Sequence, residues 1–150
     1  MLTGIMANLE ASTTVVALRQ ALLPRLEVLE AYLFGSTARA EVQPHSDIDV
    51  AVYIAEPVPE SPGFGYEADL TAYLMQALRT NRVDLVLLNR APPVLYQRVL
   101  RDGVRLLARV PHDTATRELR ALSRYCDYVP QLAKIEAAHR ARRAVGAFGR

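Results

Sequence analysis

The pattern of apolar and polar positions predicts a chain of alternating helices and strands. Three short and mostly apolar runs are typical of buried strands, and they cover Val28–Phe34, Asp47–Ile54 and Val83–Leu88. Apolar residues recur at helical spacing over 12–24, 66–79 and 92–100. A short helix over 35–40, an edge strand over Val104–Ala108 and a final helix after Asp113 complete the pattern. This order predicts an α/β (α+β) fold, with a small mixed β-sheet and helices packed against it.

Capping residues and prolines predict where the helices begin and end. Ser12 is a suitable N-cap for the first helix, so residues 1–11 are expected to form a flexible N-terminus. Asp113 is the expected cap of the last helix, and Pro130 is expected to kink or divide it. The segment 56–65 holds three prolines and two glycines, which predicts a loop after the second strand.

Two polar motifs interrupt the apolar pattern. Gly35-Ser36 directly follows the first strand, and Asp47 and Asp49 lie two positions apart at the start of the second. Alternate residues of a strand face the same way, so the two carboxylates are expected on one face and Ile48 on the other, toward the interior. Two neighbouring carboxylates repel each other, and hard oxygen donors of this kind suit Mg²⁺.

The Gly35-Ser36 motif is typical of an anion site. Glycine lets a bound group approach the backbone closely, and the serine hydroxyl is a further donor. Backbone N–H groups at the start of a helix are unpaired and attract phosphate. A solvent-facing pair of aspartates is the alternative reading of Asp47 and Asp49. The apolar run that follows them favours an interior strand, where an unpaired carboxylate is costly.

These motifs resemble the signature of the DNA polymerase beta-like nucleotidyltransferase superfamily. That signature is Gly-Ser, about ten residues and then Asp-x-Asp, and here ten residues, Thr37 to Ser46, separate the two parts. The family adds a third carboxylate on a neighbouring strand, and Asp84 fits that place. Relatives often have Arg where Thr37 stands and Gly where Ala40 stands, which puts details of triphosphate contact in doubt. Arg39 is expected either to contact phosphate or to cover the short helix.

The resemblance implies a metal-dependent transfer of a nucleoside monophosphate. Asp47 and Asp49 would hold two Mg²⁺ ions, and Asp84 would bind the catalytic ion and accept the proton of the attacking hydroxyl. Gly35 and Ser36 would hold the β- and γ-phosphates of ATP, and pyrophosphate would leave. It also implies a nucleotidyltransferase core over 12–108, with 109–150 as a C-terminal helical segment packed on the core or on a partner.

The chain looks most like the minimal nucleotidyltransferase (MNT) group, the antitoxin half of toxin–antitoxin pairs with a HEPN-domain RNase. This resemblance implies an enzyme that moves AMP from ATP to a tyrosine of the toxin. Two alternatives stay open: an antitoxin that neutralises by binding alone, and a transferase acting on a small molecule such as an aminoglycoside. The complete set of aspartates argues against the first, and the short chain argues against the second. The nucleotide preference and the oligomeric state, of like or unlike chains, are left open.

Charge and cysteine content narrow the setting. Residues 1–100 hold 7 arginines and 11 acidic residues, whereas residues 101–150 hold 11 basic and 5 acidic residues. The basic segment is expected to be a solvated helix face or a docking face for an acidic protein partner; nucleic acid is not the expected partner. No apolar run is long enough for a membrane span. The single cysteine, Cys126, is expected to be a small buried residue, and the protein is expected to be cytoplasmic.

Overall fold

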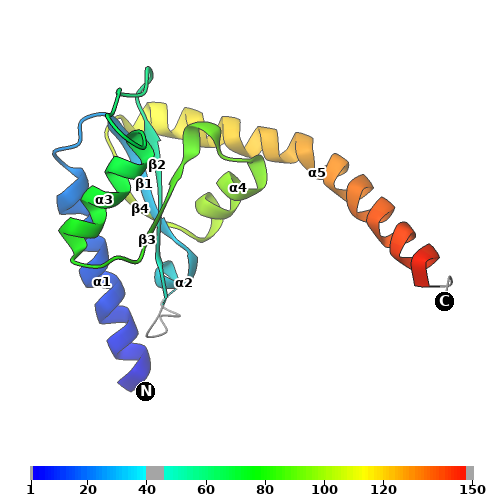
Figure 1. The fold of residues 1–150 in the computed structure, drawn as a ribbon, viewed down its shortest axis with the longest axis horizontal. Coiled ribbons are helices and arrows are strands. Elements are labelled where there is room, and N and C mark those ends of the chain that lie inside the picture. Colours follow the sequence, from blue (N-terminus) through cyan, green and yellow to red (C-terminus); the bar gives the residue numbers. More distant parts are fainter. Residues whose placement is uncertain (1, 40–45, 148–150) are drawn as a thin grey trace.

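The computed structural model describes residues 2–39 and 46–147, and in it the chain forms a four-stranded mixed sheet. The strands lie in the order β3-β2-β1-β4. The central strand β1 (Val28–Phe34) pairs antiparallel with β2 (Ile48–Ile54) and with β4 (Val104–Ala108), and β3 (Val83–Leu87) runs parallel to β2 (Figure 1). The predicted mixed sheet is confirmed, and the bounds of β1 and β4 are those predicted.

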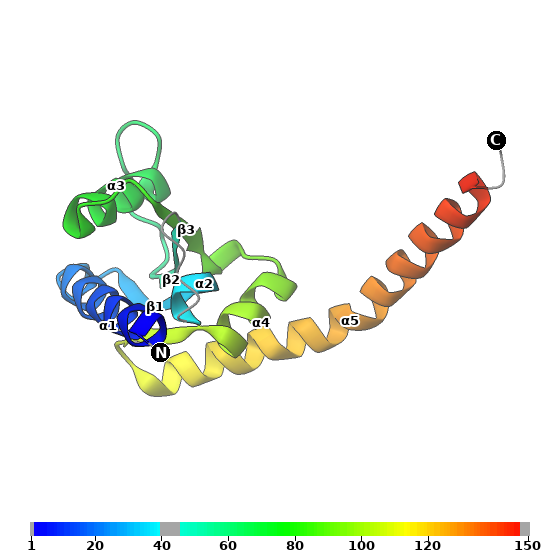
Figure 2. The ribbon, with the colours of Figure 1, turned by 90° about the horizontal axis from the view of Figure 1, so that it is seen from below.

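One face of the sheet is covered by α1 (Leu2–Leu22) and α3 (Tyr66–Leu78), which lie on the same side in Figure 2. Their buried leucines pack with every second residue of the strands, such as Val50 and Val52 of β2. This is the main hydrophobic core. Ile48 packs against it and is partly buried, which confirms the predicted inward direction of its side chain.

The other face of the sheet is covered by α4 (Pro93–Asp102) and by the first part of α5 (Pro111–Ala147). Here Tyr32, Ala51, Tyr96, Val99 and Ala121 form a second and smaller core. Two short elements complete the fold: α2 (Gly35–Ala38), which follows β1, and a 3-10 turn η1 (Leu88–Arg90), which follows β3. The aspartates and the second core share this face because residues 49, 51 and 53 alternate with the inward positions of β2.

Three details of the helices differ from the sequence-based expectations. The first helix begins at Leu2, so Ser12 lies inside it and does not cap it. The spacing of Leu2, Ile5, Met6 and Leu9 extends the helical pattern toward the N-terminus, and this outweighs the weak preference of serine for a cap. The flexibility expected of 1–11 is a separate property and stays a prediction.

The last helix begins at Pro111, because proline suits the first turn, and Asp113 therefore lies in that turn and is not the cap. Pro130 lies inside α5 and does not divide it, although the helix bends in its orange part in Figures 1 and 2. Cys126 is exposed and not buried as expected, because α5 here extends beyond the sheet that covers its earlier turns.

Candidate functional site

The turn from β1 into α2 lies directly against Asp49. Gly35 has a positive φ of 73°, and a Cβ atom built there would lie 2.0 Å from the Oδ2 atom of Asp49. The cause is the strand register, in which Phe34, at the end of β1, is the partner of Asp49 on β2. Only glycine satisfies both the backbone angle and this approach. The Gly35-Ser36 motif and the Asp-x-Asp motif are therefore joined at one place.

The same end of the sheet brings two of the predicted carboxylates together across β2 and β3. Asp49 and Asp84 are direct partners in the parallel register of these strands. Asp47 lies one residue before β2 and is exposed, as is Asp84, whereas Asp49 is half-buried. Ser36 is half-buried in α2, next to Gly35.

The electrostatics of Asp49 reflect these neighbours. Burial raises the pKa of the Asp49 carboxyl, and the negative charges of Asp84 and Asp47 raise it further, while Arg39 acts in the opposite direction. The carboxylates therefore repel one another in the folded chain, and a bound cation would relieve that repulsion. Arg39 is exposed but close enough to act on Asp49, so its charge belongs to this site.

Thr37 positions the two motifs relative to each other. Its side-chain hydroxyl is buried and donates a hydrogen bond to the backbone carbonyl of Asp47, at 3.2 Å. This bond fixes α2 against the residue that leads into β2. In the sequence, Thr37 is notable only as a departure from the family pattern, because a hydrogen bond to the backbone ten residues away leaves no local signal.

The donor set fits a hard divalent cation in chemistry. Three carboxylates, one half-buried and two exposed, lie at the same end of the sheet, and oxygen ligands of this kind suit Mg²⁺. Their side chains are not arranged around a common point: within residues 2–39 and 46–147, no three acidic, histidine or cysteine side chains lie close enough together to hold a metal ion. The exposed side chains of Asp47 and Asp84 are the ones with freedom to adjust on binding.

One buried charged pair lies on the same sheet face, at the end away from the aspartates, and was not foreseen. Glu30 of β1 is completely buried and forms an ion pair with Arg117 of α5, and Tyr32 donates hydrogen bonds to Glu30 and to Glu118. Burial raises the pKa of Glu30, and Arg117 opposes this shift. The signal that was available is the glutamate itself, because a charged residue in an otherwise apolar strand requires a buried partner.

Two of the histidines, His112 and His139, are exposed on α5, and the third, His45, lies outside the described residues. Among the helices in the described part of the chain, none is both long and apolar enough to cross a membrane.

The chain matches a known protein family. The sequence profile of the family described as "Polymerase beta, Nucleotidyltransferase" matches residues 18–112, which is more than half of the chain. The curated protein sequences give no match.

Three solved structures are similar over most of their length. A toxin–antitoxin complex solved with AMP-PNP contains a chain that is 27% identical, with a TM-score of 0.68, covering 83% of this chain and 98% of that one. The toxin–antitoxin MntA-HepT contains one that is 25% identical, with a TM-score of 0.63, covering 85% and 98%. The complex of a tri-AMPylated Shewanella oneidensis HEPN toxin with an MNT antitoxin contains a chain that is 26% identical, with a TM-score of 0.59, covering 89% of this chain and 98% of that one.

Proposed function

Because this chain belongs to the polymerase beta nucleotidyltransferase family, we propose that it transfers AMP from ATP to a tyrosine hydroxyl of a HEPN-type toxin and so acts as the antitoxin. The similar solved chains come from a toxin–antitoxin complex with AMP-PNP and from a complex with a tri-AMPylated HEPN toxin. An ATP analogue and an AMPylated partner are the two ends of such a reaction. The single unpaired cysteine is compatible with a cytoplasmic setting.

The observation that carries the proposal is the contact between Gly35 and Asp49. A phosphate-binding turn and a cation-binding carboxylate serve one reaction only if the triphosphate can touch both. Here the space that a Cβ of residue 35 would need is filled by the Asp49 carboxylate. The phosphates of ATP bound at Gly35 and Ser36 would therefore lie beside the carboxylate cluster.

In this proposal all three aspartates would bind metal. Asp47 and Asp49 would hold two Mg²⁺ ions, and Asp84 would share the catalytic one. Bound Mg²⁺ would neutralise the negative charge that develops on the phosphates and orient them. Asp49 is the most buried of the three, and its carboxyl interacts electrostatically with both of the others.

Transfer of AMP to the tyrosine requires no reactant besides ATP and the acceptor. The tyrosine oxygen forms a bond to the α-phosphorus of ATP, the bond from that phosphorus to the β-phosphate bridging oxygen breaks, and pyrophosphate leaves. Asp84 accepts the phenolic proton. Its exposed position at the start of β3 supports this role, because a group that takes a proton from a partner's hydroxyl must be reachable from outside.

The long helix α5 is the proposed contact with the partner. Its first turns pack on the core, where Thr114 and Ala121 are buried. Every residue from 133 to 144 is exposed, and this part of the helix projects away from the sheet in Figures 1 and 2. The segment 109–150 is thus proposed to pack on the core at its start and on the partner beyond it, with 12–108 as the catalytic core. Its basic character suits an acidic partner surface.

Mass spectrometry of the partner tests the proposal. The chain is incubated with a cognate HEPN-type toxin, ATP and Mg²⁺, and the intact toxin is then weighed. We expect AMP adducts on a tyrosine, and no adduct with the Asp47→Asn variant. Tight binding and neutralisation without an adduct would favour an antitoxin that acts by binding alone. Transfer to an aminoglycoside and to no protein would favour a small-molecule transferase.

A further inference from the structure

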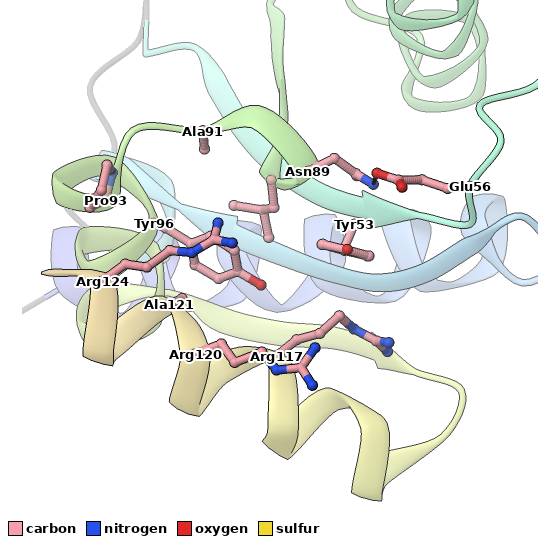
Figure 3. A pocket seen from close by; sticks show the side chains of 11 residues that line it. Tyr53, Glu56, Asn89, Ala91, Pro93, Tyr96, Arg117, Arg120, Ala121 and Arg124 are labelled. Atoms are coloured by element: carbon pink, nitrogen blue, oxygen red, sulfur yellow. Dashed lines mark hydrogen bonds between the residues drawn. The ribbon is translucent and has the colours of Figure 1, made fainter.

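A second concave site lies on the sheet face that carries the aspartates, at the opposite end of β2. It is a pocket of about 350 Å³, and Figure 3 shows Tyr53 and Tyr96 on one side and three arginines of α5 on the other. These arginines, Arg117, Arg120 and Arg124, are spaced by three and four residues, which places them on one face of the helix. We call this site the arginine pocket.

The arginine pocket carries positive charge that the described chain does not neutralise. Arg117 is paired with the buried Glu30. Arg120 and Arg124 are exposed, and within the described ranges no acidic side chain forms an ion pair with either. Glu56 is the acidic side chain among the residues that line the pocket, and it accepts a hydrogen bond from Asn89. Two guanidinium groups are thus available for an anion.

A buried hydroxyl in the same pocket has no partner. The Tyr96 side chain is 7% exposed, and no hydrogen-bonding partner for its hydroxyl lies in the described part of the chain. Leaving such a group unpaired costs free energy, so the position favours a ligand that accepts a hydrogen bond. Burial raises the pKa of Tyr96, so the hydroxyl keeps its proton and remains a donor. In Figure 3 its oxygen points into the pocket, toward the side of Arg117.

The remaining walls suit a flat and partly apolar group. The Arg117 guanidinium lies 5.0 Å from the centre of the Tyr53 ring, which holds both side chains in place. Leu88 and Ala121 contribute apolar surface. Arginine side chains bind phosphate with geometric specificity, and an aromatic and apolar wall accepts a nucleobase.

We propose that the arginine pocket is a second nucleotide site, which binds the phosphate of a nucleoside monophosphate through Arg120, Arg124 and the Tyr96 hydroxyl. The group has two sources. It is either free AMP or an AMP group already attached to the acceptor, as the tri-AMPylated toxin of the similar complex would present. The second source rests on the proposed function, whereas binding of AMP itself does not.

The arginine pocket is separate from the aspartate site. None of the five site residues predicted from the sequence lines it. Tyr53 is four residues from Asp49 along β2, which at a rise of about 3.3 Å per residue puts their backbones about 13 Å apart. Both residues face the same side of the sheet, and Ala51 between them is buried in the second core, which separates the two sites.

Titration of the isolated chain with AMP, followed by NMR in a buffer containing EDTA, tests the site directly. We expect shifts at the amides of Tyr53, Tyr96 and Ala121. The double substitution Arg120→Ala and Arg124→Ala should weaken the affinity for AMP about tenfold or more. Arg140→Ala with Arg143→Ala removes the same charge from the exposed part of α5 and should leave that affinity unchanged. Shifts confined to Gly35–Ala38, or equal affinities in all three proteins, would overturn the proposal.

Tyr96→Phe gives a second test that removes a single hydroxyl from the pocket. We expect it to weaken AMP binding about fivefold, as loss of one hydrogen bond does. Repeating the titration with Mg²⁺ and saturating AMP-PNP shows whether there are two nucleotide sites. Persistent shifts at the pocket would support a second site, whereas displacement of AMP by AMP-PNP would mean a single one and would overturn the proposal.

The two sources separate when the toxin is present. If the pocket holds attached AMP groups, the double arginine variant should add the first AMP at the parent rate and later ones more slowly. If it holds free AMP, added AMP should change the first transfer, and the variant should abolish that change. These outcomes need an active transferase, but the AMP titration does not, so failure of the proposed function and failure of the second site are distinguishable.

Discussion

The two ends of one sheet face carry opposite charge and are built differently. At the end where β2 and β3 begin, burial and the negative charges of Asp84 and Asp47 raise the pKa of Asp49, with Arg39 as the opposing charge. At the other end, Arg117 of the arginine pocket forms an ion pair with the buried Glu30. The acidic end is strained by its own charges and suits a cation. At the basic end Glu30 neutralises Arg117, while Arg120 and Arg124 are available to bind an anion.

The opposite face of the sheet, in contrast, buries apolar side chains. It is covered by α1 and α3 and buries apolar side chains such as Leu18, Leu70 and Leu74. Folding is served by that face. The face under α4 and α5 also carries charged groups. A buried one such as Glu30 costs stability unless it is paired, whereas Asp84 and Arg120 are exposed to solvent. The predictions below separate groups that serve chemistry from groups that serve folding.

The largest effect is expected at the acidic end. Asp49→Asn should lower the rate of AMP transfer about a thousandfold or more, because phosphoryl transfer depends on positioned charge. The free energy of unfolding should stay the same or rise, since the substitution removes repulsion. Asp69→Asn, an exposed carboxylate on α3, is the matched control and should keep the parent rate, measured by pyrophosphate release. A stable and fully active Asp49→Asn protein would remove Asp49 from the mechanism.

The basic end should respond in stability. Arg117→Ala leaves Glu30 buried without its partner and should lower the free energy of unfolding by about 3 kcal/mol. Arg105→Ala breaks the more exposed pair with Glu118 and should lower it by about 1 kcal/mol or less. Urea unfolding of both variants gives the comparison. Equal losses would mean that the buried pair does not hold α5 on the sheet.

A smaller effect is expected where the two motifs meet. Gly35→Ala forces a Cβ into the Asp49 carboxylate and should lower the free energy of unfolding by about 2 kcal/mol, and with it the transfer rate. Gly63→Ala is the matched control. Gly63 also has a positive φ, but a Cβ there meets no atom within 4 Å, so only backbone strain of about 1 kcal/mol applies. If both variants lose the same stability, the close approach at Gly35 is not as described.

The smallest effect is a pH dependence at Glu30. Because burial raises its pKa in the folded state, ionised Glu30 costs stability as pH rises through that raised value. The stability of the parent relative to Glu30→Gln should therefore be greatest in acid and should fall toward neutral pH, by less than about 1 kcal/mol because Arg117 opposes the shift. Chemical unfolding of both proteins across pH 4–8 measures it, and a difference that grows in the parent's favour toward neutral pH would contradict it.

Much of the fold could be predicted because its signals are local. The apolar runs Val28–Phe34 and Val104–Ala108 match β1 and β4, and the proline and glycine loop over 56–65 separates β2 from α3 as expected. The start of α1 was missed because Ser12 resembles a cap although the helical spacing continues before it. The exposure of Cys126 was missed because the sequence does not show where α5 leaves the core.

The sequence shows the residues proposed for the site, but it does not show their contacts. Gly35, Ser36 and the aspartates are visible as motifs, but the contact of Gly35 with Asp49 depends on the register of β1 with β2. The arginine pocket is harder still. The spacing of its arginines is visible in the sequence, whereas their position opposite Tyr53 depends on how α5 packs on the sheet. Register and packing are long-range properties that no single segment encodes.

The position of the isotope after one turnover tests the central claim most directly. The chain, a HEPN-type toxin and Mg²⁺ are mixed with ATP that carries radioactive phosphorus either at the α-phosphate or at the γ-phosphate. The account predicts that the α label moves to the toxin and the γ label is released in pyrophosphate, and that Asp49→Asn stops both. A γ label on the toxin, or no label on a toxin that is nonetheless neutralised, would contradict it.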